Sequence, residues 1–248
     1  MAEPLRKPDA PAFYALRTGG WRDYVTLLHP PYTAWHLSYV AIGWSVAETV
    51  HVDRLVALLI AFFLAVGIGA HALDELNGRP LRTQIPSRAL WVLAAVSIGL
   101  ACGIGIAGAA RTRWTLLALV AFGGFVVAAY NLEWFGGRFH SNRWFALAWG
   151  AFPALTASFA SDLRPTLPAA GAAAACFALS LAQRTLSTPV RALRRRTRSV
   201  TGHVERSDGS VELIDADWLR RPPEAALRAL SFALPLLALA LVVSRLVA

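Results

Sequence analysis

Residues 55–81 read LVALLIAFFLAVGIGAHALDELNGRPL. The first part, Leu55–Leu73, is apolar apart from His71 and is long enough to cross a bilayer, which takes about 18 or more apolar residues. Polar and ionisable groups follow at once. Because burying such groups in a membrane is costly, they usually face a cavity and serve a function. The stretch therefore predicts a transmembrane helix that ends in a candidate site.

Apolar stretches of this kind recur along the chain, separated by short polar turns. The predicted spans are Thr33–Val50, Leu55–Leu73, Ala89–Ala110, Trp114–Tyr130, Trp144–Ala160, Leu167–Leu186 and Ala225–Val247. The sequence thus predicts an all-α fold, a polytopic membrane bundle of about seven transmembrane helices. We expect a cytoplasmic segment over residues 1–32, a six-helix membrane core over 33–186, a cytoplasmic loop over 187–223 and a last transmembrane helix over 224–248.

The composition excludes other classes. Of the 248 residues, 56% are hydrophobic and only 16% are charged, whereas soluble domains average about 25% charged residues. The apolar content also excludes disorder. Residues 1–32 contain no short apolar core followed by a small-residue cleavage site, so the first helix is expected to be a permanent anchor.

The positive charge is distributed unevenly between the two predicted faces. The chain has 24 Lys and Arg and a net charge of +9. With seven spans, 18 of these basic residues fall on the face of the N-terminus and five on the other. Cytoplasmic loops collect Lys and Arg, so we expect an integral protein of the inner or plasma membrane with its N-terminus in the cytoplasm and its C-terminus outside. The basic face lacks any nucleic-acid-binding module.

The 187–223 segment contains a turn signal. Val200–Val204 and Val211–Leu213 alternate apolar and polar residues around Asp208-Gly209, a dipeptide typical of hairpin turns. The sequence predicts a β-hairpin here, with Pro222 and Pro223 opening the last helix.

Several small residues in the predicted spans match the spacing of known sequence motifs. Gly103, Gly105 and Gly108 spell a dinucleotide fingerprint, but they lie inside an apolar helix with no preceding strand. Gly99 and Gly103 form a small-xxx-small pair that predicts close helix packing. Cys102 and Cys176 fall within spans and are expected to be small buried hydrophobes.

The first candidate cluster ends the 55–73 span. His71, Asp74 and Glu75 are spaced i, i+3, i+4 and would share one helix face. Carboxylate oxygens on one face suit Mg²⁺, so Asp74 and Glu75 are the predicted metal ligands and His71 a further catalytic candidate. Asn77 and Arg79 follow as candidate substrate-binding groups. The alternative is a solvated helix end.

The second cluster lies in the loop after the fourth span. Tyr130 and Glu133 are catalytic candidates there, while Asn131, Arg138 and His140 are candidates for substrate binding. The alternative is an ordinary interfacial loop.

Two further positions complete the candidate site. Arg184, at the end of the sixth span, is a candidate for phosphate binding because arginine matches phosphate oxygens bidentately. Arg194–Arg196 are at least as well explained as an orientation signal or a patch attracted to anionic lipid. His36, near the cytoplasmic end of the first span, could face the cavity or serve the structure alone.

These positions resemble the UbiA-type intramembrane prenyltransferase superfamily. The likeness covers residues 25–190 and is carried by His29–Thr33 through Gly43, by Asp74–Leu81 with Ile85 and Ala89–Leu100, and by Tyr130–Trp144 with Gly150–Pro153. The resemblance implies a helical bundle with a cavity open to the lipid and capped on the cytoplasmic side. There, Mg²⁺ held by two aspartate-rich motifs binds an isoprenyl diphosphate, whose loss of diphosphate gives an allylic cation that an acceptor captures.

The chain departs from that pattern. The family's first motif is usually Asn-Asp-x-x-Asp-x-x-x-Asp; with Asp74 as its middle aspartate, Ala70, His71 and Gly78 stand in the other places. The second motif is replaced by Gln183–Arg191, and the C-terminal part is shortened. We expect a divergent enzyme for prenyl transfer, or for diphosphate elimination or cyclisation, with one Mg²⁺ and with Arg79, Arg138 and Arg184 supplying the missing charge.

Two other functions fit the same scaffold. One is a non-catalytic protein that binds an isoprenoid or another lipid or assists membrane assembly. The other is a transition-metal enzyme that uses His71, Asp74, Glu75, Glu133 and His140. Membrane lipids are expected partners in every case.

Overall fold

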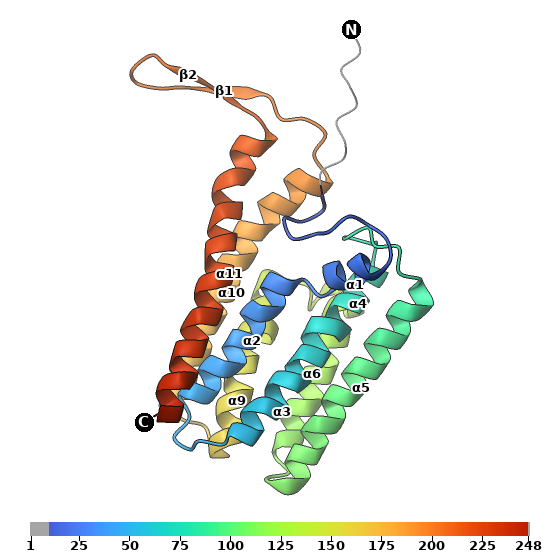
Figure 1. The fold of residues 1–248 in the computed structure, drawn as a ribbon, viewed down its shortest axis with the longest axis vertical. Helices are drawn as coiled ribbons and strands as arrows, with labels where there is room; N and C mark the ends of the chain where they lie inside the picture. Colours follow the sequence, from blue (N-terminus) through green and yellow to red (C-terminus); the bar gives the residue numbers. More distant parts are fainter. Residues whose placement is uncertain (1–9, 248) are drawn as a thin grey trace.

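The computed structural model describes residues 10–247, so Arg6 and Lys7 of the predicted basic face lie outside the described residues. Helix makes up 74% of the structure, which confirms the all-α fold. Within the described residues, seven helical segments build one bundle, and consecutive segments run in opposite directions (Figure 1).

The elements follow one another with short connections. Their bounds are α1 Trp21–Leu27, α2 Pro30–Ser45, α3 Val52–Phe62, η1 Phe63–Ala70, α4 His71–Leu76, α5 Ser87–Arg111, α6 Leu116–Asn131, α7 Trp134–Gly137, α8 Asn142–Ala146, η2 Leu147–Ala151, α9 Phe152–Asp162, α10 Leu167–Arg195, β1 Gly202–Glu205, β2 Val211–Ile214 and α11 Ala216–Val247.

Three helices are long and apolar enough to cross a membrane: Val52–Leu76, which joins α3, η1 and α4, then Ser87–Arg111 and Ala216–Val247. Helix α6 is apolar but shorter. Their outward faces carry large exposed apolar side chains such as Val96 on α5 and Leu237 on α11. These features give the chain the character of a membrane protein.

Close helix contacts depend on Gly43 and Gly150, two glycines in the stretches that carry the family resemblance. A Cβ at Gly43 of α2 would lie 2.1 Å from the Ala154 carbonyl oxygen of α9. A Cβ at Gly150 would lie 2.6 Å from the Cys176 carbonyl oxygen of α10. By contrast, nothing lies within 4 Å of a Cβ added at Gly99 or Gly103, so the predicted close packing there is wrong. Periodicity marks a small-residue face but not whether a neighbour covers it.

Two π-helical turns interrupt otherwise α-helical segments. The segment η1 lies between α3 and α4, and η2 lies between α8 and α9. A π turn shifts the backbone pairing and often marks a functional position. Both turns lie toward the end of the bundle that holds the cavity described below.

Helices α10 and α11 are longer than predicted. The sixth span was expected to end at Leu186, but α10 continues through Pro189 to Arg195. The last helix begins at Ala216 instead of at Pro222, because the Asp215 side chain accepts a hydrogen bond from the Trp218 backbone N–H at 2.7 Å and starts it earlier. The connection is therefore shorter than 187–223.

Strands β1 and β2 occupy this connection and pair antiparallel around the Asp208-Gly209 turn, where the sequence predicts a hairpin. Gly209 has φ +81°, a conformation that glycine adopts readily. The hairpin projects beyond the helices at the end opposite the C-terminus (Figure 1).

At the C-terminal end of the bundle, arginines fasten neighbouring segments. Arg54 donates to the Ala160 carbonyl, Arg113 to the Leu163 carbonyl and Arg245 to the Ala47 carbonyl. Arg164 forms an ion pair with Glu48. Four of the five basic side chains at this end are thus engaged in contacts between segments, whereas Arg111 is exposed.

Candidate functional site

A polar cavity of about 430 Å³ opens at the hairpin end of the bundle. It lies where α2 begins and where α4, α6 and α10 end, so side chains far apart in sequence converge on it. Nine predicted site residues line this single cavity: His36, His71, Asp74, Asn77, Tyr130, Asn131, Glu133, His140 and Arg184. The structure thus brings the three sequence clusters together.

Glu75 and Arg79 lie outside the cavity wall. The Glu75 carboxylate is fully buried and accepts hydrogen bonds from the Leu81 N–H at 2.9 Å and from both the N–H and the hydroxyl of Thr83 at 2.8 Å. Arg79 donates to the Ile85 carbonyl at 2.5 Å and to the Ser87 hydroxyl at 2.7 Å. Both residues fasten the connection between α4 and α5, so their predicted roles at the substrate do not fit their positions.

Arg138 also lies outside the cavity lining. It follows a short segment in left-handed backbone conformation, in which Glu133, Phe135, Gly136 and Gly137 all have positive φ. That backbone turns Glu133 toward the cavity wall and leaves Arg138 beyond it. The position of Arg138 therefore does not fit its predicted role in binding an anion in this cavity.

Helix α10 contributes arginines that the sequence reading set aside. Arg184, Arg191 and Arg195 are spaced i, i+7, i+11, which places them on one helix face, and all three line the cavity. The change from apolar to polar residues at Leu186 and the proline at position 189 suggested that the helix ends there. If the helical spacing is continued past both positions, it places Arg191 and Arg195 on the same face as Arg184, and this spacing is the signal that could have identified them.

The charges on this face are unequally compensated. Arg194 binds Glu224 of α11 through one Nη2 atom at 2.6 and 2.9 Å, with both side chains nearly buried. Arg184 donates to the Asn142 side-chain oxygen at 3.1 Å and lies over the Phe145 ring. Among residues 10–247, no carboxylate forms an ion pair with Arg184, Arg191 or Arg195. The cavity therefore holds more arginine than carboxylate charge, because Asp74 and Glu133 are the carboxylates that line it among the described residues.

Two buried polar atoms on the cavity wall have no hydrogen-bond partner in the described part of the chain. They are the Tyr130 hydroxyl and the Gln183 side-chain oxygen, on residues only 5% and 3% exposed. A buried polar group left unpaired costs about 1–3 kcal/mol. Both atoms are therefore available to pair with water or with a polar ligand in the cavity.

The segment before α1 covers the cavity. Residues 11–14 line it, and α10 holds this segment through Arg194 to the Ala10 carbonyl at 3.1 Å and Arg195 to the Pro11 carbonyl at 3.2 Å. Burial raises the pKa of Tyr14 well above its usual range, so its phenol stays neutral and remains a hydrogen-bond donor. Nothing in the local sequence of this segment signals that it closes the site.

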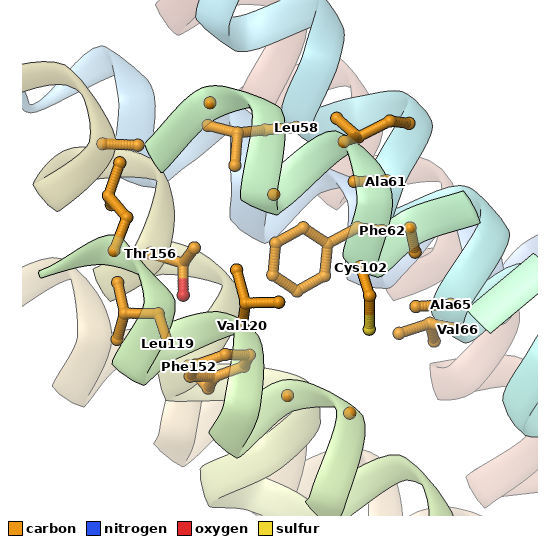
Figure 2. Close-up of a pocket in the computed structure, with 18 of the residues that line it drawn as sticks. Leu58, Ala61, Phe62, Ala65, Val66, Cys102, Leu119, Val120, Phe152 and Thr156 are labelled. Carbon is orange, nitrogen blue, oxygen red and sulfur yellow. The ribbon is translucent and has the colours of Figure 1, made fainter. Parts of the chain in front are cut away.

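An apolar groove of about 170 Å³ adjoins the polar cavity. It is lined by α3, η1, α5, α6 and α9; Figure 2 shows Leu58, Phe62, Cys102 and Val120 around it, with Thr156 carrying the one oxygen among the labelled side chains. Trp149 of η2 lines both the groove and the polar cavity. The arginine-lined cavity and the apolar groove thus share this residue in their walls.

The donor set departs from the paired acidic motifs of the resemblance. Among the described residues there is no group of three or more His, Cys, Asp or Glu that could hold a metal ion. Asp74 lines the cavity, whereas Glu75 is saturated elsewhere. The cavity lining offers the carboxylates of Asp74 and Glu133, and Mg²⁺ held by one or two carboxylates takes its remaining ligands from substrate phosphate and water.

Comparison of the chain with protein-family models, with curated proteins and with solved structures gives no match.

Proposed function

We propose that this chain is a divergent UbiA-like intramembrane enzyme that acts on an isoprenyl diphosphate at the hairpin end of the bundle. One observation carries the proposal: the arginine-lined cavity and the apolar groove meet at Trp149. A ligand with a highly charged head and a long apolar chain matches that pair of compartments. An isoprenyl diphosphate is such a ligand.

The head group would bind to the α10 face. Arg184, Arg191 and Arg195 offer guanidinium forks to the diphosphate oxygens, and the unpartnered Tyr130 hydroxyl can donate a further hydrogen bond. The chain would extend past Trp149 into the groove between α3, α5, α6 and α9. Burial of the chain there supplies affinity without polar contacts.

The reaction begins with cleavage of the allylic carbon–oxygen bond. The electron pair leaves with the diphosphate, and preorganised arginines stabilise the charge that develops on it. The faces of Tyr130, Phe145 and Trp149, whose rings lie 4.6–6.1 Å apart, are suited to stabilise the allylic cation by cation–π attraction. Mg²⁺ would be held by Asp74 together with the diphosphate and would add positive charge at the leaving group.

The proposal includes a topology. All seven helical segments cross an inner or plasma membrane, and the cavity end with its excess of arginine faces the cytoplasm. Substrate would enter from the surrounding lipid, since the groove lies among helices whose outer faces are apolar. The C-terminus would lie outside.

A direct assay tests the proposal. The purified full chain in nanodiscs is incubated with labelled geranyl, farnesyl and geranylgeranyl diphosphate, with and without Mg²⁺, and both bound label and released diphosphate are measured. Release by the wild type, lost in Asp74→Ala and retained in Arg198→Ala, supports the enzyme. Binding without release for every chain length would contradict catalysis and favour a lipid-binding protein. No binding of any of the three would overturn the proposal as a whole.

A further inference from the structure

Residues 10–18, here called the strap, precede α1 and run as a loop at the hairpin end of the bundle (Figure 1), where Pro11–Tyr14 line the polar cavity. The strap has no regular secondary structure. Among the described residues, its only backbone–backbone hydrogen bond joins the Ala15 N–H to the Ala12 carbonyl at 3.1 Å, within the strap itself. A segment without backbone hydrogen bonds to its neighbours opens at a small cost in free energy.

Side chains of α10 and α11 fasten the strap from outside. Arg194 and Arg195 of α10 donate to its carbonyls, as described above. Arg228 of α11 lies over the Phe13 ring, with its Cζ atom 4.8 Å from the ring centroid. The buried Glu224 carboxylate pairs with Arg194 and lies 3.5 Å from Arg228. One carboxylate thus orients two of the arginines that hold the strap.

The inner side of the strap packs through aromatic rings. The Tyr14 ring centroid lies 5.4 Å from that of His29 and 5.5 Å from that of Tyr32, and Phe13 lies 6.2 Å from Tyr32. Aromatic pairs of this kind contribute about 0.5–1.5 kcal/mol each beyond their buried area. The strap is therefore seated by contacts that can break and form again without unfolding the bundle.

A glycine pair follows the strap directly. Gly19 and Gly20 have φ +113° and +63°, and a Cβ at Gly20 would meet no atom within 4 Å. Backbone conformation, not lack of space, therefore accounts for glycine at this position. Beyond the pair, the buried Asp23 carboxylate accepts hydrogen bonds from the Gly19 N–H at 2.9 Å and the Gln84 N–H at 2.8 Å. The chain is fixed after the glycines and loosely held before them, as in a hinged lid.

Arg195 connects the strap to the interior of the cavity. Its Nε donates to the Pro11 carbonyl, while its side chain lines the cavity beside Arg191. A guanidinium group carries five N–H donors, and among residues 10–247 no hydrogen bond engages the Nη atoms of Arg195. An anion could thus bind these Nη groups while Nε keeps its bond to the strap. The same anion would offset the charge repulsion between Arg191 and Arg195.

We propose that the strap is a lid, hinged at Gly19 and Gly20, that opens to admit an anionic ligand and closes over it. In the closed state Arg195 joins the ligand to the strap. The inference rests on the proposed function in taking a diphosphate as the anion, but it requires neither the prenyl chain nor the reaction. Because binding and closure share Arg195, each stabilises the other by the same factor.

Hydrogen exchange of the full chain in nanodiscs measures the lid without an activity assay. The Leu16 amide of the strap donates to the Thr26 hydroxyl of α1 at 3.0 Å, and Leu16 does not line the cavity, so a bound anion does not shield this amide itself. The Gly19 amide, held by Asp23, is the internal reference. Inorganic pyrophosphate is the probe, and calorimetry measures its binding separately.

In the wild type, saturating pyrophosphate should slow exchange of the Leu16 amide at least about fivefold, the lower end of coupling between sites, and should change Gly19 less than twofold. In Arg195→Ala, Arg184 and Arg191 still bind the anion, but saturating pyrophosphate should slow Leu16 exchange less than about twofold, because the link to the strap is lost. Arg198→Ala, which removes an exposed charge outside the cavity lining, is the matched control and should respond like the wild type.

Loosening the strap should have the opposite effect on exchange. Phe13→Ala removes the ring under Arg228 and should speed Leu16 exchange about fivefold without any anion, as expected for the loss of about 1 kcal/mol of contact. Phe13→Leu keeps apolar bulk but also lacks the ring, so it should show the same direction of change. If Phe13→Ala unfolds at a lower temperature, the Leu variant decides.

The contrary outcomes are distinct. Pyrophosphate that binds without slowing Leu16 exchange, or that slows it equally in Arg195→Ala, would overturn the lid and leave the proposed head-group site standing. Unchanged exchange in both Phe13 variants would also overturn the lid. Failure of the wild type to bind pyrophosphate would instead overturn the head-group site of the proposed function, and the coupled closure with it.

Discussion

Asp74 and Glu75 are adjacent in the sequence, yet their carboxylates serve different environments. Asp74 lines the polar cavity, whereas Glu75 is fully buried and accepts three hydrogen bonds from the connection between α4 and α5. Successive residues on a helix point about 100° apart, so one carboxylate can serve a ligand while its neighbour holds the backbone. Asp74 is thus placed to contact a ligand, whereas the adjacent Glu75 stabilises the fold.

Exchange of each carboxylate for its amide should reveal that division. In Glu75→Gln the new amide N–H₂ meets groups that themselves donate, so we expect a loss of about 1–3 kcal/mol of stability. Asp74→Asn should unfold within about a degree of the wild type but lose diphosphate release. Thermal unfolding in detergent and the release assay measure the two effects. Equal unfolding temperatures for both variants would contradict the assigned role of Glu75.

The arginine face of α10 should bind the diphosphate. Arg191→Ala and Arg195→Ala are each expected to weaken isoprenyl diphosphate binding about tenfold, which corresponds to about 1.4 kcal/mol. Arg198→Ala removes the same charge from a residue that is exposed and outside the cavity lining, and it should change binding less than twofold. Equal weakening in all three would show that bulk positive charge attracts the ligand and that the face itself contributes nothing.

Tyr130→Phe separates ligand binding from folding. The hydroxyl is buried without a protein partner, so its removal should leave the unfolding temperature unchanged or slightly raised. If the hydroxyl donates to bound diphosphate, affinity should fall about fivefold, the value of one hydrogen bond of about 1 kcal/mol. A marked loss of stability in this variant would mean that the hydroxyl has a partner within the fold.

Helix packing at Gly43 can be tested by a paired substitution. Gly43→Ala places a methyl group 2.1 Å from the Ala154 carbonyl oxygen, so α2 and α9 must separate, at a cost of about 3 kcal/mol. Gly99→Ala meets no atom within 4 Å and improves helix propensity, so its stability should be equal or higher. Unfolding of the two variants side by side gives the comparison. A stable Gly43→Ala protein would rule out this contact.

Acid should destabilise the protein through His29. Burial, with a smaller effect from His71, lowers the pKa of His29 well below its usual range. The unfolded chain then takes up the proton first as the pH falls below about 6.5, so the stabilisation is complete above that pH and declines below it, by up to about 1.4 kcal/mol per pH unit. Unfolding temperatures between about pH 8 and pH 5 should show a shallower decline in His29→Gln than in the wild type. Parallel curves would contradict the assignment.

Much of the bundle could be predicted because a long run of apolar residues indicates a helix that is surrounded by lipid or by other apolar side chains. The polar interruptions at Asp74, Tyr130 and Arg184 also gave the right neighbourhood, since unpaired polar groups at the ends of apolar helices need a cavity. The helix ends were less predictable. Leu186 and Pro222 looked like boundaries. Helix α10 continues past Leu186, where Arg194 pairs with Glu224 of α11, and α11 begins before Pro222, where the Asp215 side chain caps it.

The sequence by itself determined the helical class, the membrane character and the uneven charge, because composition and periodicity are properties of the chain alone. Only the tertiary structure decided that Glu75 and Arg79 face a connection instead of a substrate, that Arg191 and Arg195 join Arg184, and that the segment before α1 covers the cavity. The direction of a side chain depends on helix rotation and on partners up to 113 residues away, as for His36 and Trp149. A sequence pattern lists the groups available, and packing selects which of them meet.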